Sequence, residues 1–497
     1  MTHPLLARRS SGILLHLTSL PGPHGSGDLG VASRHFLDWL VSAGQSAWQI
    51  LPLSPPGPGH SPYQSPSAFA GSPWLIDLDE LVARGWLDPL PDPGFDSQRC
   101  DFARVLPWRL AALRRAWAGF GRHADAGDRA ALDEFARQQA AWLTDYARFM
   151  VLQERHGAPW TQWPAALARR EPDALAALDA TAAGEIGFWR FLQWCFFRQW
   201  QTLRTAAHVR GIQIIGDAPI FVAHHSADVW SRTGQFLLDD AGEPTVVAGV
   251  PPDYFSATGQ RWGNPLYRWD AMAADGFRWW KDRLAHLFTL VDLVRLDHFR
   301  GFDAYWAIPA DEPTAIAGQW CAGPAHGFFA TVAKELGPLA LLAEDLGIIT
   351  DSVTQLREDC GFPGLRVMQF AFDGKPANPY LPHNFAPQTV VYTGTHDNTT
   401  TADWWQQASA TEQQAVRDYL GPQADREIHW AMIQSLSQSV ARTLVVPFQD
   451  VLGLDGRHRM NTPGQAEGCW TWRFDWLQVD DRPSNRLRAL VHAHGRI

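Results

Sequence analysis

The stretch VDLVRLDHFRGF, from Val291 to Phe302, begins as an apolar run of strand length and ends in charged residues. Side chains in a strand alternate between its two faces, so Leu293, Arg295 and Asp297 share one face. The positive charge of Arg295 favours the ionised form of a neighbouring carboxyl group, so we expect Asp297 to stay ionised. An ionised, partly desolvated carboxylate at a strand end is a candidate nucleophile. The alternative is a structural ion pair that caps the strand, because ion-pair networks also perturb pKa values.

Apolar runs of strand length recur along the chain and alternate with helical patterns. The eight predicted strands cover residues 12–20, 47–53, 212–217, the opening stretch, 339–346, 365–372, 389–394 and 443–448. Eight strands that alternate with helices predict an α/β fold, the (β/α)8 or TIM barrel. Polar residues recur at the ends of the third, fourth, fifth and seventh predicted strands. Catalytic residues of such barrels lie at the carboxyl ends of strands, so these positions are candidates for chemistry.

The chain of 497 residues is expected to form one catalytic barrel unit, residues 1–497, because α/β barrels run long as single units. Two insertions interrupt the predicted barrel. Residues 77–210 are mostly helical by pattern, and residues 219–288 are expected to be rich in loops that cover the substrate. No run typical of a β-sandwich follows residue 448, so a C-terminal sandwich domain is not expected.

Composition limits the partners and the compartment. The net charge of −10 argues against nucleic acid or an anionic membrane as a main partner. Five scattered cysteines without a C-x-x-C pair are typical of a reducing compartment, and no apolar run reaches the length that spans a membrane. Arg8-Arg9 faintly resembles a twin-arginine signal, but the apolar run that follows is short and is interrupted by His16. We therefore expect a cytoplasmic protein.

Three carboxylic residues at predicted strand ends suggest glycoside chemistry. A retaining mechanism needs two carboxyl groups about 5–5.5 Å apart, of which one attacks the anomeric carbon and the other serves as acid and then base. Asp297 fits the first role. Glu344 fits the second because it ends an apolar strand, where burial would raise its pKa toward neutrality. Asp397, beside His396, could stabilise positive charge in the transition state. Each residue alone could instead cap a strand or a turn.

Six motifs support the same interpretation. They are HLTSLPG (16–22), SPYQS (61–65), PPDYFSATGQRWGNP (251–265), RLDHFRGF (295–302), EDLG (344–347) and THDN (395–398). With them, the chain from Leu14 to Arg473 resembles the 4-α-glucanotransferases called amylomaltases or disproportionating enzymes. These form glycoside hydrolase family 77 of the α-amylase superfamily.

The resemblance implies roles for individual residues. Asp297 would be the nucleophile, Glu344 the acid/base and Asp397 the transition-state stabiliser. The expected substrate-binding residues are Tyr63, Asp217, Gln260, Trp262, Arg295, His298, Asp345 and His396. Tyr63 would stack on the sugar next to the scissile bond, and Gln260 and Trp262 would lie on a long loop that closes over the glucan.

The implied reaction transfers a segment of an α-1,4-glucan to the 4-hydroxyl of glucose or a malto-oligosaccharide, through a covalent intermediate on Asp297. The implied substrates are malto-oligosaccharides, amylose and glucans derived from starch or glycogen. An α-glucan hydrolase and a non-catalytic glucan-binding barrel are the alternatives. No cofactor is expected, and no metal, because the carboxylates and His298 lack a metal-ligand spacing such as H-x-x-x-H.

The chain departs from the family at one position. The late motif of the family usually reads N-x-P-G-T-x-x-G-N-W, whereas here it reads NTPGQAEGCW, with Cys469 in place of the second Asn. A thiol cannot supply the donors and the acceptor of an amide. We therefore expect a family sugar contact to be altered there, and a thiol open to oxidation or labelling.

Overall fold

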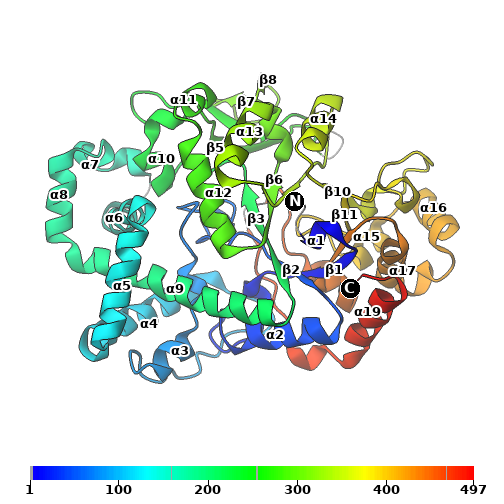
Figure 1. The fold of residues 1–497 in the computed structure, drawn as a ribbon, viewed down its shortest axis with the longest axis horizontal. Coiled ribbons are helices and arrows are strands. Elements are labelled where there is room, and N and C mark those ends of the chain that lie inside the picture. The colour runs from blue at the N-terminus through cyan, green and yellow to red at the C-terminus, as the bar shows by residue number, and fades with distance from the viewer. Residues whose placement is uncertain (1–3, 158, 253–255, 466, 497) are drawn as a thin grey trace.

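The computed structural model describes residues 4–157, 159–252, 256–465 and 467–496. Eight parallel strands close into a barrel in the order β1-β12-β11-β10-β9-β6-β3-β2 (Figure 1). They are β1 (Ser10–Leu14), β2 (Ala47–Gln49), β3 (Gln213–Pro219), β6 (Leu293–Asp297), β9 (Leu341–Ala343), β10 (Gly364–Val367), β11 (Thr389–Tyr392) and β12 (Thr443–Pro447). The predicted barrel is confirmed. Several strands are shorter than predicted, because the chain turns into short 3-10 segments such as Leu17–Ser19.

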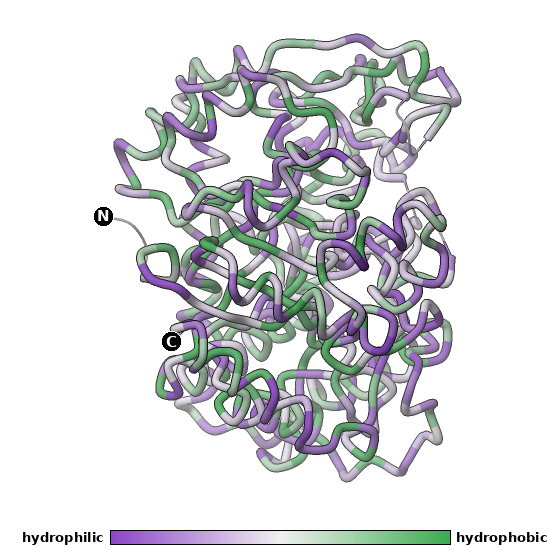
Figure 2. The backbone as a smooth tube through the Cα atoms, turned by 90° about the vertical axis from the view of Figure 1, so that its right-hand side faces the viewer, coloured by the Kyte–Doolittle hydropathy of each residue, from purple (hydrophilic) through white to green (hydrophobic). Residues whose placement is uncertain are grey.

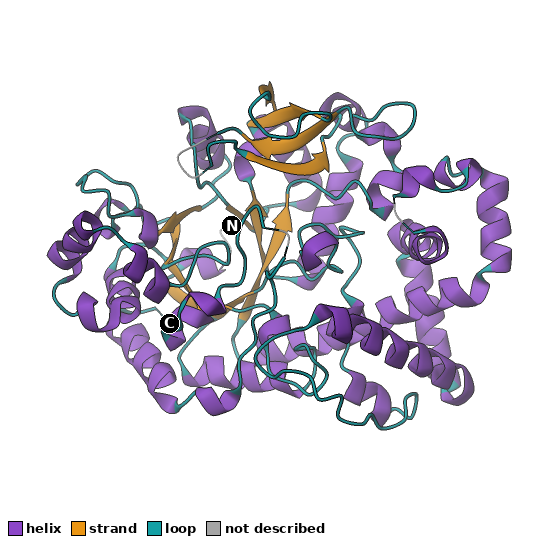
Figure 3. Ribbon diagram, turned by 180° about the vertical axis from the view of Figure 1, so that it is seen from behind, coloured by secondary structure: helices purple, strands orange, loops and turns teal. Residues whose placement is uncertain are grey.

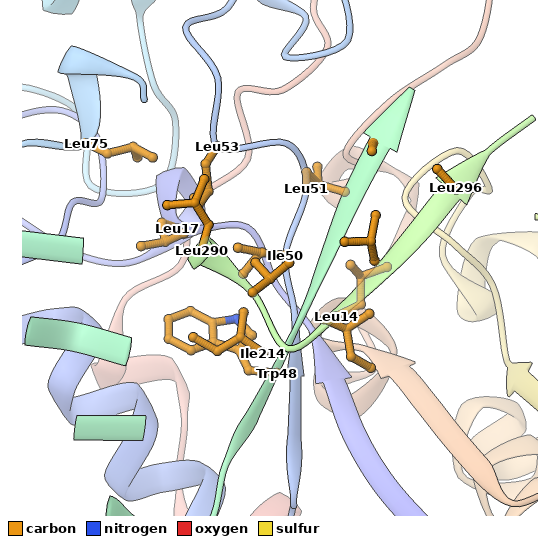
Figure 4. Packing of buried hydrophobic residues seen from close by; sticks show 14 of the residues in the cluster. Leu14, Leu17, Trp48, Ile50, Leu51, Leu53, Leu75, Ile214, Leu290 and Leu296 are labelled. Carbon is orange, nitrogen blue, oxygen red and sulfur yellow. The ribbon is translucent and has the colours of Figure 1, made fainter. Parts of the chain in front are cut away.

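The barrel strands are apolar because both of their faces are buried. Trp48 of β2 is fully buried, and its Nε1 donates to the carbonyl of Leu15 over 2.7 Å. Figure 4 shows this ring close to Ile214 of β3 and Ile50, within a cluster of buried leucines and isoleucines. Gly12 allows β1 and β2 to approach closely, because an added Cβ would lie 2.6 Å from the Cβ of Ala47. Figure 2 shows hydrophobic stretches through the middle of the molecule, with hydrophilic residues interleaved along the outer segments.

The strand register brings the candidate residues to one end of the barrel. In the β3–β6 pair, Asp217 lies opposite Arg295 and Pro219 lies opposite Asp297. In the β6–β9 pair, Leu296 lies opposite Ala343, the last residue of β9, so Glu344 follows at the same end. Because all eight strands are parallel, this is the carboxyl end, where (β/α)8 barrels place their chemistry.

The predicted helical insertion, residues 77–210, lies beside the barrel on the left of Figure 1. Its helices are α3 (Leu78–Ala83), α4 (Phe102–His123), α5 (Ala126–Gln138), α6 (Ala140–His156), α7 (Ala165–Ala168), α8 (Pro172–Thr181) and α9 (Ala183–Val209). Asp77 caps α3 by accepting from the N–H groups of Asp79 and Glu80, which otherwise have no partner at a helix start. Trp200 of α9 anchors the insertion to the barrel, since its Nε1 donates to the carbonyl of Leu290 over 3.0 Å.

A second, antiparallel sheet in the order β5-β4-β7-β8 lies apart from the barrel (Figure 3). Its strands are β4 (Val246–Val250), β5 (Gln260–Pro265), β7 (Ala304–Pro309) and β8 (Gln319–Ala322). We call it the cap sheet. The sequence analysis expected residues 219–288 to be rich in loops and predicted none of these four strands. The strand β5 is polar, with the sequence QRWGNP, and forms a strand only through pairing with β4.

The remaining helices surround the barrel. They are α1 (Pro4–Ala7), α2 (Val31–Ser42), α10 (Ala227–Ser231), α11 (Trp269–Ala274), α12 (Arg278–Leu290), α13 (Ala325–Leu336), α14 (Asp351–Asp359), α15 (Thr401–Gln407), α16 (Ala410–Leu420), α17 (Ala424–Gln438), α18 (Phe448–Leu452) and α19 (Asp481–Ala493). Among the described residues, none of the helices combines the length and the apolar character needed to cross a bilayer.

Candidate active site

Arg295 joins two carboxylates at the carboxyl end of β6. Its buried guanidinium donates from Nη1 to both oxygens of Asp217, at 2.9 and 2.7 Å. Its Nη2 lies 2.9 Å from Oδ1 of Asp297. The predicted ion pair between Arg295 and Asp297 is therefore present, and the strand register adds Asp217 from β3 to it. The cation fixes the orientation of the candidate nucleophile.

The pKa of Asp297 differs from the expected direction. Burial raises it to about 6, the negative charges of Asp217 and Asp397 add to the rise, and Arg295 opposes it. Arg295 favours the ionised form, as expected, but desolvation and two like charges outweigh this one cation. A pKa near 6 still leaves Asp297 mainly ionised at neutral pH, as a nucleophile requires.

Glu344 follows β9 and faces the same end of the barrel. Its pKa is raised to about 8, because burial and the charge of Asp297 outweigh the effect of Arg295 and of the two backbone N–H groups. Its Oε2 accepts from the backbone N–H of His298 at 2.8 Å, and its Oε1 accepts from the N–H of Leu346 at 3.1 Å. The predicted rise in the pKa of Glu344 is confirmed. This carboxyl group is mainly protonated at neutral pH and can act as an acid.

His298 makes the sharp bend that follows Asp297. Its φ of 53° lies in the left-handed region, which is uncommon for a residue other than glycine. The bend points its N–H at Glu344, and the next N–H, of Phe299, donates to the Glu344 carbonyl over 3.1 Å. We call residues 297–303 the nucleophile turn and residues 344–350 the acid/base loop. The two segments are thus joined by backbone bonds.

Tyr63 and His396 connect this centre to the end of β11. The Tyr63 hydroxyl lies 2.9 Å from Oδ2 of Asp217 and 2.9 Å from Nε2 of His396. If it donates to the carboxylate, it accepts from the His396 N–H. The two rings stack at 5.3 Å, and Nε2 of His396 lies 3.4 Å from Oδ1 of Asp397. One chain of polar contacts therefore runs from Asp297 through Arg295 and Asp217 to Asp397.

The sequence analysis missed three residues beside Asp397. Asn461 donates from Nδ2 to Oδ1 of Asp397 at 2.6 Å, and the Arg459 guanidinium donates to the Asp397 carbonyl. Trp470 has a left-handed φ of 64°, and its ring lies 5.8 Å from that of Tyr63. These residues follow β12 in an irregular segment, so no strand end marked them. The late motif, which contains Asn461 and Trp470, was the available signal.

Trp262 and Gln260 lie in β5 of the cap sheet and not in a loop, which corrects the expectation. Nε1 of Trp262 donates to Oε1 of Gln260 at 3.1 Å. The Trp262 ring meets the His298 ring edge to face at 4.8 Å, so the cap sheet contacts the nucleophile turn directly. Of the predicted 251–265 stretch, Asp253 to Phe255 lie outside the described residues.

Asp345 is the predicted substrate-binding residue that the structure does not join to this group. It is 3% exposed, and its Oδ1 accepts from the N–H of Leu365 at 2.7 Å. Arg366 and Arg357 lie 3.2 and 3.3 Å from Oδ2. Adjacent residues at a strand end point to opposite sides, so with Glu344 in the site Asp345 faces β10 and α14. These contacts join the acid/base loop to β10 and α14.

Cys469 also differs from the expectation of an accessible thiol. It is 5% exposed and lies inside its own loop, where Sγ accepts from the N–H of Thr462 at 3.3 Å. The carbonyl oxygens of Thr462, Gln465 and Glu467 all lie within 3.9 Å of Sγ. A buried thiol is a poor target for oxidation or labelling. Its contacts hold together the loop that precedes Trp470.

Asp297 and Glu344 form a pair of carboxyl groups that can take part in the transfer of a proton and a glycosyl unit. One carboxyl group is mainly ionised and the other mainly protonated at neutral pH, and both belong to neighbouring strand ends. A pair of carboxyl groups with unequal pKa values can supply one nucleophile and one acid. Within the described residues, no three His, Cys, Asp or Glu side chains are grouped so as to hold a metal ion. Metal-free chemistry stays a prediction.

Known proteins resemble this chain along nearly all of its length. The family profile described as 4-alpha-glucanotransferase matches residues 15–478. The 4-alpha-glucanotransferase of Thermus thermophilus is 49% identical, over 98% of this chain and 99% of that protein. The 4-alpha-glucanotransferase of Synechocystis sp. is 47% identical, over 99% of each. The solved amylomaltase from Streptococcus agalactiae, in complex with acarbose, superposes with a TM-score of 0.95 at 35% identity, over 98% of this chain and 100% of that one. The chain therefore belongs to the 4-alpha-glucanotransferase family.

Proposed function

We propose that this protein transfers a segment of an α-1,4-glucan to the 4-hydroxyl of an acceptor glucose or malto-oligosaccharide, with retention of configuration. One observation carries the proposal. Asp297 and Glu344 are linked through the His298 backbone N–H, yet their pKa values are about 6 and about 8. At neutral pH the pair therefore supplies one carboxylate and one carboxylic acid, as the first step of a retaining mechanism requires.

In the first step, a carboxylate oxygen of Asp297 attacks the anomeric carbon while Glu344 donates its proton to the departing 4-oxygen. The glycosidic C–O bond breaks, a bond between the glycosyl unit and Asp297 forms, and the shortened glucan leaves with the proton of Glu344. Asp397, which accepts from Asn461, faces the positive charge that develops on the sugar ring. Arg295 keeps Asp297 oriented for attack.

In the second step, Glu344 acts as a base. Once Asp297 is esterified its charge is gone, so the pKa of Glu344 falls because a like charge has been removed. Glu344 takes the proton of the acceptor 4-hydroxyl, that oxygen attacks the anomeric carbon, and Asp297 leaves as a carboxylate. Two inversions give net retention, and the enzyme returns to its starting protonation state.

Substrate contacts are proposed for the side chains around this pair. Tyr63 is supported as a platform for the sugar next to the scissile bond, since it lies beside His396 and Asp217. His298 offers Nε2, which is buried and has no hydrogen-bond partner among the described residues, to a sugar hydroxyl. Trp262 and Gln260 would cover the glucan from the cap sheet. The other substrate-side residues proposed are Asp217, Arg295 and His396.

The proposed donors and acceptors are malto-oligosaccharides, amylose, glucans derived from starch or glycogen, and glucose, with no cofactor. The Streptococcus agalactiae relative was solved with acarbose, which supports a saccharide as ligand of this site. We further propose a cytoplasmic location. All five cysteines are free thiols in the structure, in agreement with a reducing compartment.

The test is incubation with maltotriose, followed by separation of the products and titration of reducing ends. Transfer exchanges one glycosidic bond for another, so we expect glucose and a ladder of longer oligomers with a constant number of reducing ends. The α-glucan hydrolase alternative predicts only shorter sugars and a rising number of reducing ends. The non-catalytic glucan-binding barrel predicts unchanged maltotriose.

A further inference from the structure

Arg300 is a buried cation in the nucleophile turn that the proposed reaction does not use. It is 6% exposed, and burial lowers its pKa, opposed only by Asp303. Within the described part of the chain no carboxylate forms an ion pair with it, and its Nε lacks a hydrogen-bond partner. Burying a guanidinium without a carboxylate is costly, so its remaining contacts must offset that cost.

One of these contacts is with the acid/base loop. Nη1 of Arg300 donates to the carbonyl of Ile348, four residues after Glu344 in the sequence. Leu346, within the same short loop, donates its N–H to Oε1 of Glu344 at 3.1 Å. The side chain of Ile348 is exposed, so packing contributes little to holding this part of the loop. Arg300 thus fixes the backbone that orients Glu344.

The second contact is with the cap sheet. The guanidinium carbon of Arg300 lies 3.9 Å from the centroid of the Trp320 ring, within the range of a cation–π interaction. Trp320 is on the edge strand β8, is 42% exposed, and meets Trp306 of β7 edge to face at 5.2 Å. The aromatic face therefore supports the guanidinium and leaves Nη1 directed at Ile348.

A neighbouring residue of the nucleophile turn, Asp303, contacts α14, the helix that follows the acid/base loop. Oγ of Ser352, at the start of α14, donates to Oδ2 of Asp303 at 2.9 Å. Asp303 in turn accepts at its carbonyl from the N–H of Gly323, which follows β8, at 2.7 Å. The nucleophile turn, the acid/base loop and the cap sheet therefore meet around Arg300 and Asp303.

We propose that Arg300 is a positioning residue for the acid/base, clamping the acid/base loop to the nucleophile turn with Trp320 of the cap sheet as its support. The proposal rests on the proposed function, because it assigns Arg300 a part in proton donation by Glu344. It also gives the cap sheet a role in the chemistry: the sheet sets the geometry of the acid as well as covering the substrate.

The test compares two donors in Arg300→Met and Arg300→Lys. Maltotriose has a leaving group that must be protonated, whereas the fluoride of α-glucosyl fluoride needs little protonation. A well-placed general acid contributes about 10²–10⁴-fold in rate, so its misplacement in Arg300→Met should lower kcat for maltotriose about tenfold or more relative to α-glucosyl fluoride. KM should change little. Arg300→Lys should recover part of the loss, because an ammonium can still donate to the Ile348 carbonyl.

Two further variants keep the proposal falsifiable if Arg300→Met does not fold. Trp320→Ala should lower kcat for maltotriose relative to kcat for α-glucosyl fluoride, by a smaller factor than Arg300→Met. Trp320→Phe should restore this ratio of kcat values. Arg486→Met is the matched control, because Arg486 of α19 also stacks on an indole ring, that of Trp430 at 4.4 Å. It should leave both donors unaffected.

Three outcomes are decisive. A selective loss with maltotriose in Arg300→Met or Trp320→Ala supports the positioning role. An equal loss with both donors, or no loss with either, overturns it while leaving the proposed function intact. Wild-type protein that does not disproportionate maltotriose overturns the proposed function, and the role of Arg300 falls with it.

Discussion

The backbone N–H of His298 donates to Oε2 of Glu344 over 2.8 Å, so the residue that follows the candidate nucleophile holds the candidate acid. His298 itself has a left-handed φ of 53°, so the chain bends sharply just after this N–H. A bond of this kind stabilises the ionised form of Glu344 and still leaves its pKa near 8, since burial has the larger effect. The two carboxyl groups are therefore coupled through one peptide unit, and the following predictions depend on that coupling.

The pH dependence of kcat/KM with maltotriose should be bell-shaped. Asp297 must be ionised, so activity should fall as pH decreases through about 6, and Glu344 must be protonated, so activity should fall as pH increases through about 8. Glu344→Gln should remove the basic limb, because an amide does not titrate, and should spare α-glucosyl fluoride relative to maltotriose. If Glu344→Gln lowers the rate with maltotriose and the rate with α-glucosyl fluoride by the same factor, Glu344 is not the acid of the first step.

Asp297→Asn should lower turnover by several orders of magnitude, because the covalent route is closed. The change is nearly isosteric, and Arg295 keeps its two bonds to Asp217, so the unfolding temperature should change little. Azide added with α-glucosyl fluoride should restore consumption of the donor and give a glycosyl azide of inverted configuration. Near-normal turnover in protein whose mass confirms the substitution would contradict the assignment.

Asn461→Ala should lower kcat/KM about tenfold to a hundredfold. Hydrogen bonds to charged groups contribute about 1.5–3 kcal/mol, and Asn461 donates to Oδ1 of Asp397 at 2.6 Å. At neutral pH, Asn461→Asp should lower kcat/KM more than Asn461→Ala does, because it places a second negative charge against Asp397. If both variants are as active as the wild type, Asp397 is oriented by Arg459 and His396 without Asn461.

Trp262→Ala should increase the share of hydrolysis over transfer. The Trp262 ring packs on His298 from the cap sheet, and its loss opens the site to water while the glycosyl intermediate waits for an acceptor. The number of reducing ends formed per glucose released measures this share. Trp262→Phe is the control, because a smaller ring can still meet His298. An unchanged share in Trp262→Ala would leave the indole a structural role only.

Cys469→Asn should raise the unfolding temperature, whereas Cys469→Ala should lower it. An asparagine oxygen can accept from the N–H of Thr462, and its amide can donate to the carbonyl oxygens that now surround Sγ. An alanine leaves that N–H without a partner in a buried loop. The melting temperatures of the two variants check this order, and a reversed order would mean that the loop fits the thiol better than an amide.

The sequence determined the barrel and the order of the three carboxylic residues. Eight apolar runs specify strands buried on both faces, four of these runs end in polar residues, and parallel strands bring their carboxyl ends together. The raised pKa of Glu344 could be predicted, because the apolar residues just before it form a buried strand and so place its carboxyl group in a buried environment. The polar strand β5 could not be recognised, because its pairing partners in β4 are supplied by the fold.

Only the tertiary structure decided the environment of each carboxyl group. Arg295 meets Asp217 across 78 residues of sequence, and Asn461 meets Asp397 across 64. The sequence placed Arg295 two residues before Asp297 and so indicated a cation that favours the ionised carboxylate, but the folded site adds Asp217 and Asp397 and removes water. The desolvation of a carboxyl group and its interactions with charges far away in the sequence depend on which segments pack together. The local sequence does not contain that information. The support of Arg300 by Trp320 has the same origin, since it exists only where β8 closes against the nucleophile turn.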